Sequence, residues 1–264
     1  MNQVKISVIT PVLNGEATIE KCLYSVAIQD YPHKEHWIID GISSDKTLEI
    51  VKKYAEKYPH IRYISQKDTG IYQAMNRGID LSSGEWLYFL GCDDVLENPS
   101  ILTEVSYNFQ PNTDWLLGKI ALTGFSKPII RTPSTSWKRY LFSSILHQGC
   151  FYKKKLFDTV QYDESFVIAG DYKLNLQLLE WKIPYQHINL IVCNHSVEGK
   201  SGQSIDITLK ENIRLRYEVL PLHKAFFWNG IIYCSFYTMQ AIKTFLPLRY
   251  IQKLQLLKQT YIMK

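Results

Sequence analysis

The amino-acid sequence predicts an α/β protein: a doubly wound, mixed sheet with helices on both faces, followed by a C-terminal helical appendage. Strand and helix signals alternate through the first hundred residues, which is typical of right-handed βαβ units and a parallel sheet. From Asp114 the apolar runs are shorter and indicate strands with antiparallel turns. After Ser204 the pattern is helical to the end of the chain.

The first half contains four apolar runs of strand length, separated by segments with helical spacing. Strands are expected at 6–10, 36–40, 61–64 and 86–90, and helices at 17–27 and 71–81. A further helix carries Leu48 and Tyr54. We expect Ser43 or Ser44 to cap that helix, with Asp45 at its positive end.

The second half predicts the mixed part of the sheet. Two separate strands joined by an antiparallel turn are expected at 115–118 and 120–122, and further strands at 149–152 and 188–192. A helix is expected at 171–181, where several leucines recur at helical spacing.

Length and composition indicate a globular protein that needs no covalent staples. The chain has 264 residues, 46% hydrophobic and 21% charged, which is enough to bury a large core. Its five cysteines form no C-x-x-C pair, so we expect reduced thiols in a cytosolic protein. The strand-like start of the chain has no basic and apolar leader, and no signal peptide is predicted.

Basic residues are concentrated near the C-terminus. The formal net charge is +5, and from Lys200 onward there are ten lysines and arginines but only three acids. Apolar and aromatic residues are interleaved with these bases. That mixture favours an anionic membrane surface as a partner over nucleic acid.

The stretch 225–242 is uncharged and rich in aromatic residues. Its length approaches that of a membrane span, but it also contains several polar residues. Three interpretations stay open: a span, an in-plane amphipathic anchor, and a helix buried against the rest of the protein. We favour the in-plane anchor, because basic residues flank the stretch and would meet anionic lipid.

Carboxylates follow three of the four predicted strands of the first half. Asp40 ends the second, Asp68 lies just beyond the third, and Asp93-Asp94 follow the fourth. The carboxyl ends of parallel strands meet at one edge of a sheet, where open α/β sheets bind their ligands. Adjacent anions repel, so this edge predicts a bound Mg²⁺ or Mn²⁺ ion, which prefers oxygen ligands and bridges carboxylates to phosphates.

Each of these acids also has a plain structural interpretation. Asp93-Asp94 is a common turn sequence, and Asp40-Gly41 is a turn followed by a serine cap. The coincidence of several acids on one edge favours function. Gly91 before the pair allows close approach of a ligand, and Cys92 is a soft thiol that we expect to pack in the core.

Longer segments resemble family 2 glycosyltransferases with the GT-A fold. VITPVLNGEATIEKCLYSVAIQDYPHKEHWIIDGISSDKT is similar to the family's first motif, and DTGIYQAMNRGIDLSSGEWLYFLGCDDVL to the stretch that runs into its D-x-D-type metal motif. HQGCFYKKKLF…DYKLNLQLL resembles its acceptor-side segment. The resemblance extends in order from Ser7 to Ser204. It implies a catalytic domain at 1–205, with a nucleotide-binding half at 1–95 and an acceptor-binding half at 96–205, and a basic, aromatic tail at 206–264.

The resemblance implies roles on the donor side. Pro11 and Asp40 would hold the base, and Asp93 the ribose or a metal-linked water. Asp94 would coordinate the metal on the diphosphate, with His195 as a further candidate ligand. The remaining donor-side candidates are Asp68, Asn76, Arg77 and Lys200, the last in a loop that would close over the diphosphate. The structural alternatives are a helix cap at Asp68-Thr69-Gly70 and a surface position for Asn76.

On the acceptor side the resemblance implies a general base, because inverting transfer takes the proton from the attacking hydroxyl and needs no covalent intermediate. The candidate is Asp171, for which an N-terminal helix cap is the structural alternative. His147 and Gln148 match a segment that contacts sugar or acceptor in related enzymes; such a pair is more often structural.

The predicted function is therefore an inverting, metal-dependent transferase that moves a sugar from a nucleotide diphosphate, with UDP favoured, to a saccharide or lipid-linked acceptor. We expect it in the cytoplasm, peripheral on the inner face of the plasma membrane, in polysaccharide or glycolipid assembly. One alternative is a sugar nucleotidyltransferase, which would want a glycine-rich basic loop after the first strand. The other is an inactive nucleotide-sugar-binding protein, which is disfavoured by the intact Asp40, Asp93, Asp94 and Asp171.

Overall fold

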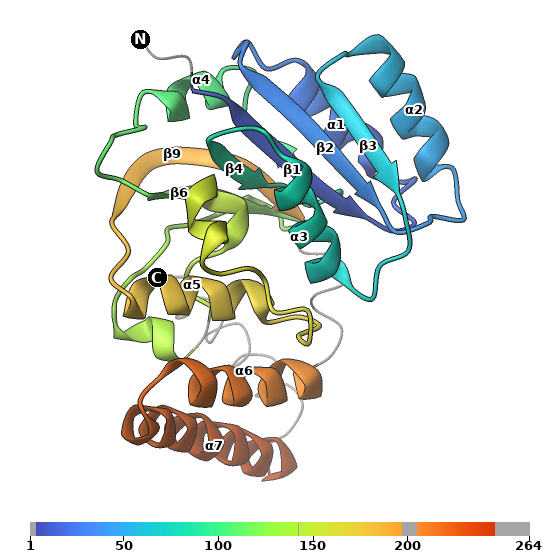
Figure 1. Cartoon of the computed structure of the whole chain (residues 1–264). Helices are drawn as coiled ribbons and strands as arrows, with labels where there is room; N and C mark the ends of the chain where they lie inside the picture. The colour runs from blue at the N-terminus through green and yellow to red at the C-terminus, as the bar shows by residue number, and fades with distance from the viewer. Residues whose placement is uncertain (1–3, 142, 197–204, 246–264) are drawn as a thin grey trace.

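A nine-stranded mixed sheet forms the centre of the computed structural model, which describes residues 4–141, 143–196 and 205–245 (Figure 1). Helices cover both faces of the sheet, and two further helices follow at the C-terminal end. The predicted fold class is confirmed, including the mixed character of the sheet.

The first half of the chain is a parallel, doubly wound unit. Its strands are β1 (Ile6–Val12), β2 (Lys34–Asp40), β3 (Ile61–Ser65) and β4 (Trp86–Phe89), in the order β3-β2-β1-β4. The connecting helices are α1 (Ile19–Ala27), α2 (Thr47–Lys57) and α3 (Ile71–Leu81). The chain leaves β1 for β2 on one side and returns to β4 on the other, so the strand order reverses at β1. Ligands of open α/β sheets bind at such a point.

The second half extends the sheet from β4. The strands are β8 (Cys150–Lys153), β6 (Trp115–Thr123), β9 (Tyr185–Ser196) and the two-residue β5 (Val95–Leu96), with β7 (Ile129–Arg131) paired to β6. Strand β8 is antiparallel to both β4 and β6, whereas β6 and β9 are parallel. Helices α4 (Ile101–Ser106) and α5 (Gly170–Glu180) and short 3-10 turns at 137–140, 147–149 and 154–158 complete this half.

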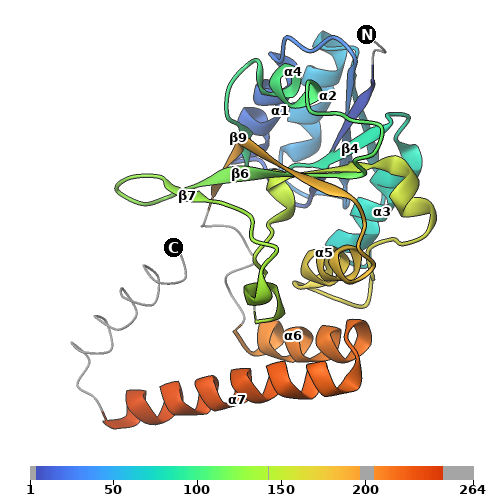
Figure 2. The same cartoon turned by 90° about the vertical axis from the view of Figure 1, so that its left-hand side faces the viewer.

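Two apolar cores hold the sheet between its helices. Alternate residues of a strand point to opposite faces, so Val8 packs with α1, α2 and α4 while its neighbour Ile9 packs with α3 and α5. Figure 2, which views the sheet from another side, shows these two helical layers. Residues at the carboxyl ends of β1 to β4 are thereby anchored from both faces.

Two local predictions are wrong. The runs at 115–118 and 120–122 form the single strand β6, and within it Gly118 lies so close to β9 that a Cβ there would be 2.5 Å from Val192. The strand continues past this contact with a register shift. The serines do not cap α2 either: the helix begins at Thr47, whose N–H donates to the Asp45 carboxylate at 3.0 Å.

Helices α6 (Ile205–Val219) and α7 (Leu222–Phe245) form a hairpin against α5 (Figures 1 and 2). No helix among the described residues is long and apolar enough to cross a bilayer. The hairpin buries one side: Ala225 and Asn229 are shielded from solvent, whereas Phe226 and Phe227 are exposed.

Candidate active site

The predicted acidic edge exists in the structure. Asp40 is the last residue of β2, Asp68 lies three residues beyond β3, and Asp93-Asp94 follow β4. Because these three strands are parallel, their acids share the carboxyl-terminal edge of the sheet. Pro11 lies in β1 between them, opposite Ile39 of β2.

Asp40 is fully buried, and its carboxylate already has protein partners. It accepts hydrogen bonds from the Ser43 N–H at 3.2 Å and from the Ser65 hydroxyl at 2.5 Å. These bonds close the turn after β2, as the structural interpretation expects.

Asp68 forms a close ion pair with Arg77 of α3, at 2.5 Å between Oδ1 and Nη1. Burial raises the pKa of Asp68 even though the Arg77 guanidinium opposes the shift. Its second oxygen is buried with no partner in the described part of the chain. Asn76 is also buried and binds both the N–H and the carbonyl of Tyr162, so its interpretation as a surface residue is wrong.

Asp93 and Asp94 lie side by side in the turn after β4. Burial raises the pKa of Asp93, and repulsion by the Asp94 carboxylate adds to the shift. A Cβ at Gly91 would lie 2.7 Å from Asp94 Oδ2 and 2.9 Å from Asp93 Oδ1. Glycine therefore leaves open the space that both carboxylates face.

His195 at the end of β9 pairs with Asp94. Its Nδ1 lies 2.8 Å from Asp94 Oδ1, which also accepts a hydrogen bond from the Ser196 N–H at 3.1 Å. Burial disfavours the imidazolium, but the hydrogen bond and charge of Asp94 outweigh it and raise the pKa of His195. The Asp171 carboxylate also contributes to this shift.

This cluster fits a hard divalent cation. Asp94 Oδ2 is fully buried and, within the described ranges, has no hydrogen-bond partner, although a buried carboxylate oxygen normally has one. No group of three His, Cys, Asp or Glu side chains in those ranges is arranged as a complete metal cage. Mg²⁺ and Mn²⁺ do not need such a cage, because one or two carboxylates and substrate phosphates commonly hold them. Burial raises the pKa of the Cys92 thiol to about 11, and the side chain packs against the core as expected.

Asp171 lies in the first turn of α5, where its side chain makes no capping bond to the helix, so the cap interpretation is wrong. Its Oδ2 instead lies 3.0 Å from His147 Nδ1, and the Tyr72 hydroxyl oxygen lies 3.5 Å from Oδ1. The three side chains come from α5, from the turn before β8, and from α3. They hold the carboxylate in one orientation while about a sixth of it remains exposed.

Gln148 is buried next to this group, and its side-chain oxygen has no partner among the residues described. Its backbone carbonyl accepts from the Tyr88 hydroxyl at 2.8 Å. Lys200 lies outside the described residues. Of the other sequence candidates, the structure brings together two groups: Asp93, Asp94, His195, Asp171 and His147 in one, and Asp40, Asp68 and Arg77 in the other.

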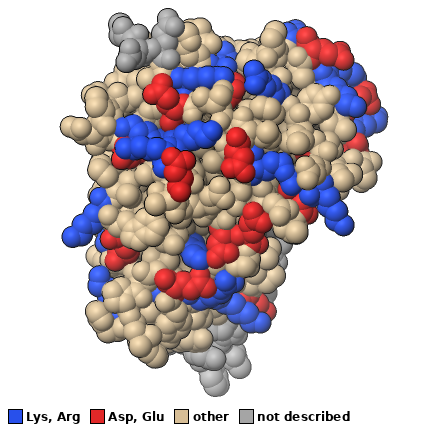
Figure 3. Space-filling view, in the orientation of Figure 1, with Lys and Arg blue, Asp and Glu red and all other residues tan. Residues whose placement is uncertain are grey.

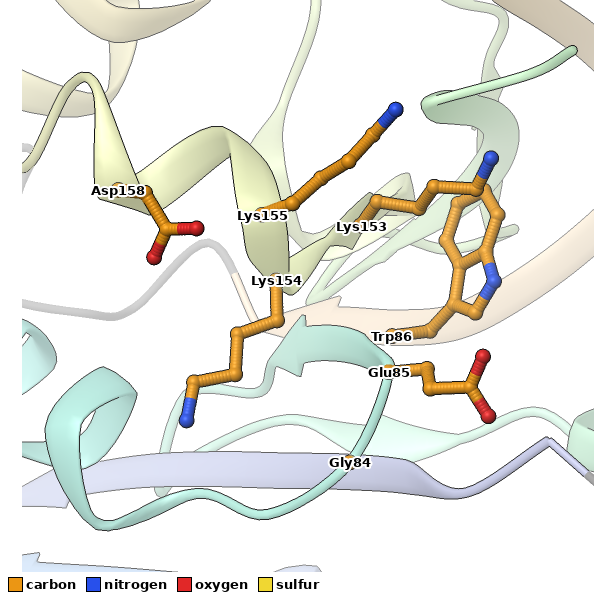
Figure 4. Close-up of a pocket in the computed structure, with 7 residues that line it drawn as sticks. All are labelled: Gly84, Glu85, Trp86, Lys153, Lys154, Lys155 and Asp158. Carbon is orange, nitrogen blue, oxygen red and sulfur yellow. The ribbon is translucent and has the colours of Figure 1, made fainter.

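Sequence reasoning missed Tyr72, which lies in the motif DTGIYQAMNRG but carries no charge to draw attention. The hollow in Figure 4, of about 350 Å³, lies elsewhere: Trp86 at the amino end of β4 lines it, opposite the acidic edge. Lys153 and Lys155 extend to one side of it, where both pair with Asp114. Asp114, together with Glu85 and Asp158 of the lining, offsets the lysine charges, so we assign no anion site there.

Comparison with known proteins identifies this chain as a nucleotide-sugar-dependent glycosyltransferase. The profile of Glycosyl transferase family 2 matches residues 7–174. A PGL/p-HBAD biosynthesis glycosyltransferase of Mycobacterium tuberculosis is 35% identical over 222 residues, which cover 79% of this chain and 82% of that protein. The chain belongs to glycosyl transferase family 2.

Solved structures share the arrangement. Staphylococcus aureus TarS 1–349 in complex with UDP-GlcNAc has a TM-score of 0.70 at 19% identity, covering 93% of this chain and 77% of that one. The mannosyltransferase PcManGT from Pyrobaculum calidifontis, in complex with GDP-Man and Mn²⁺, has a TM-score of 0.62 at 16% identity, covering 99% and 81%. At these identities the likeness shows the fold, which is the expected GT-A fold.

Proposed function

We propose that this glycosyltransferase is inverting and depends on Mg²⁺ or Mn²⁺, and that it moves a sugar from a UDP-sugar to an acceptor hydroxyl in envelope polysaccharide or glycolipid assembly. One observation carries most of this proposal. The Asp93–Asp94–His195 cluster contains a buried carboxylate oxygen without a partner in the described part of the chain, facing the space at Gly91. The Asp171 carboxylate lies close enough to influence His195.

On the donor side, Asp94 and His195 would hold the ion and Asp93 the ribose. When bound, the ion offsets the charge of the diphosphate and stabilises it as a leaving group. Asp68 and Arg77 would line the donor pocket. Pro11 and Asp40 would contact the base, and Lys200 the diphosphate.

On the acceptor side, Asp171 would accept the proton of the acceptor hydroxyl as that oxygen attacks the anomeric carbon. The sugar–phosphate bond breaks on the opposite face, so the configuration inverts in one step. His147 holds the carboxylate in place and Tyr72 holds the backbone before it, which limits the reorganisation that the reaction requires. Gln148 would contact sugar or acceptor.

The choice of donor and acceptor rests on relatives. TarS has been solved with UDP and with UDP-GlcNAc, which supports a UDP-sugar. PcManGT was solved with GDP-Man and Mn²⁺, which makes GDP-sugars the necessary comparison. The printed name of the mycobacterial relative concerns PGL/p-HBAD biosynthesis, which supports a glycolipid acceptor.

A donor panel tests the proposal. The protein is incubated with UDP- and GDP-sugars and alkyl glycoside acceptors, with Mn²⁺ or with EDTA, and nucleotide release and glycoside product are measured. We expect a UDP-sugar to give product of inverted anomeric configuration only with metal. Metal-independent transfer or retention of configuration would contradict the proposal. A nucleotidyltransferase would instead form a sugar nucleotide from UTP and a sugar phosphate, and an inactive protein would bind without releasing nucleotide.

The proposal includes peripheral attachment to the cytoplasmic face of the plasma membrane through α7. Leu222, Phe226 and Phe227 are each more than 60% exposed, and Figure 3 shows little charge over the end of the molecule that α7 occupies. From Lys243 to the C-terminus the sequence has five bases and no acid, which complements anionic lipid.

Flotation with vesicles tests the attachment. We expect binding to phosphatidylglycerol vesicles, weak binding to phosphatidylcholine, and loss of binding in Phe226→Ser/Phe227→Ser. Tyr107→Ser is the control, because Tyr107 is 69% exposed but lies after α4, remote from α7. Equal binding by the double variant would contradict attachment. A concentration-dependent dimer that the double variant abolishes would instead assign this surface to a second copy of the chain.

A further inference from the structure

Helix α6 of the predicted tail carries a buried carboxylate that contacts the catalytic body. Glu211 is 8% exposed. Its Oε1 accepts the Val167 N–H at 2.6 Å, and its Oε2 accepts the N–H groups of Ile168 and Ala169 at 2.9 and 2.8 Å. Three consecutive backbone donors thus converge on one side chain from 42 to 44 residues further along the chain.

These donors belong to the segment that leads directly into the candidate base. Residues 167–169 immediately precede α5, whose second residue is Asp171. Ala169 is the N-cap of α5, where a backbone N–H has no partner within the helix and needs one from elsewhere. Glu211 supplies it, and its negative charge also suits the positive end of α5.

Tyr72 holds the same segment from the opposite direction. Its hydroxyl donates to the Ile168 carbonyl at 2.5 Å and accepts from the Gly170 N–H at 2.9 Å. A Cβ on Gly170 would lie 2.7 Å from the Tyr72 ring, so only glycine fits this contact. The backbone before Asp171 is therefore held between α3 and α6.

Helix α6 is itself firmly attached to the body. Arg216, one and a half turns after Glu211, is fully buried and donates to the carbonyls of Tyr140 and Leu141, the latter at 2.7 Å. Leu215 belongs to the same apolar core as α3 and α5. Glu211 is consequently a fixed point and not a mobile surface side chain.

We propose that Glu211 is a positioning residue for Asp171, so that α6 is part of the catalytic unit. This rests on the proposed function, because it takes Asp171 as the general base. Glu211 does not touch substrate in this account. It fixes residues 167–169, and thereby the direction from which Asp171 meets the acceptor hydroxyl; a displacement of about 1 Å in such a group costs on the order of a hundredfold in rate.

Glu211→Gln tests the proposal with little change of volume. The amide presents an N–H group to backbone N–H donors, so the segment loses at least one bond. We expect kcat to fall about 10- to 100-fold with the donor selected by the panel above, UDP-GlcNAc being tried first. The donor KM and the affinity for UDP with Mn²⁺ should stay unchanged, because the Asp93–Asp94–His195 cluster lies on other elements. Glu211→Asp keeps both acceptor oxygens and should restore part of the lost kcat.

Glu218→Gln is the matched control. Glu218 lies on the same helix and joins α6 to α5 through Lys173, at 2.5 Å, but it does not contact residues 167–169. We expect normal kcat in this variant. If it lost as much turnover as Glu211→Gln, the general docking of α6, and not the hydrogen bonds from residues 167–169 to Glu211, would explain the effect.

Amide hydrogen exchange gives a readout that does not need the acceptor. In Glu211→Gln, exchange at residues 167–169 should accelerate, with the β1 and β4 amides unchanged. Unaltered exchange, unaltered kcat, or equal losses in kcat and in UDP affinity would overturn the proposal. Normal turnover by both the wild type and Glu211→Gln would overturn the role of Glu211 but leave the proposed function intact. A wild type without turnover would contradict that function, and with it the role of Glu211.

Discussion

The two ends of the parallel strands treat buried carboxylates in opposite ways. At the amino end of β2, Glu35 is 2% exposed and accepts hydrogen bonds from Lys5, Ser7 and Ser83. Burial alone would raise its pKa, but these donors lower the pKa of Glu35 to about 2. The ionised form is thus well accommodated by the protein itself.

At the carboxyl end Asp40 has protein donors, but the same sheet leaves Asp68 and Asp94 only partly satisfied. The pKa values of Asp68 and Asp93 are raised by burial. Asp68 and Asp94 each have a buried oxygen for which the described residues provide no partner. Glu35 shows that this protein can satisfy a buried carboxylate with its own donors. The difference supports the proposal that a bound cation and a diphosphate, which have the matching charge, complete the carboxyl end.

The largest effect is expected for Asp171→Asn, which removes the proposed base with almost no change of shape. Turnover should fall by roughly 10²- to 10⁴-fold. Binding of UDP with Mn²⁺ should not change, because the Asp93–Asp94–His195 cluster remains intact. Steady-state kinetics and calorimetry on the same preparation measure both quantities, and full turnover by the variant would refute the role of Asp171.

Asp94→Ala comes next and acts on binding. Without this carboxylate the cluster loses both the oxygen that lacks a partner and the hydrogen bond to His195. We expect the thermal stabilisation by UDP with Mn²⁺ to disappear while the variant stays folded. An undiminished shift of the melting temperature would place the metal elsewhere. Asp114→Ala, which removes a carboxylate at the opposite end of the sheet, should keep the shift.

At the amino end, Glu35→Gln should affect stability and leave nucleotide binding unchanged. Because the folded-state pKa of Glu35 lies below its unfolded value of 4.5, its contribution is present above pH 4.5 and is lost as the pH falls towards 2. We expect a loss of roughly 2–3 kcal/mol near neutral pH, and a flatter acid limb than in the wild type. Urea unfolding at several pH values measures this. An acid limb as steep as that of the wild type would show that Glu35 is not the group responsible.

The smallest effect has the opposite sign. The raised pKa of Asp93 means that the folded protein binds this proton more tightly than the unfolded chain, so ionisation at neutral pH costs stability. Asp93→Asn should therefore raise the melting temperature without ligand, by about 1–2 °C. Asp30→Asn is the control, since hydroxyl donors lower the pKa of Asp30 and its loss should not stabilise. A lower melting temperature for Asp93→Asn would break the contrast between the two ends.

The acidic edge could be predicted from sequence because it depends on local signals. An apolar run followed by an acid places that acid at a strand end, and parallel strands bring their ends together. Helix 71–81 was likewise predicted to the residue, since its apolar spacing is regular. The acceptor side could not be derived in this way. Asp171 was identified by resemblance, and its contacts with His147 and Tyr72 join elements 24 and 99 residues apart.

Glu211 shows the limit most clearly. In the sequence it is one acid in a basic, helical tail, and nothing near it marks a buried position. Its function as a cradle for residues 167–169 depends on how α6 docks against α5, which is a tertiary property. The prediction of two separate strands at 115–118 and 120–122 failed for a similar reason, because the close contact of Gly118 with β9 is not visible in the local sequence.

Calorimetric titration of the wild-type protein with UDP, with Mn²⁺ and then with EDTA, tests the central claim most directly. If a cation completes the carboxyl end of the sheet, UDP should bind at least tenfold more tightly with Mn²⁺, about 1.4 kcal/mol or more. Equal affinity in both conditions would contradict the account.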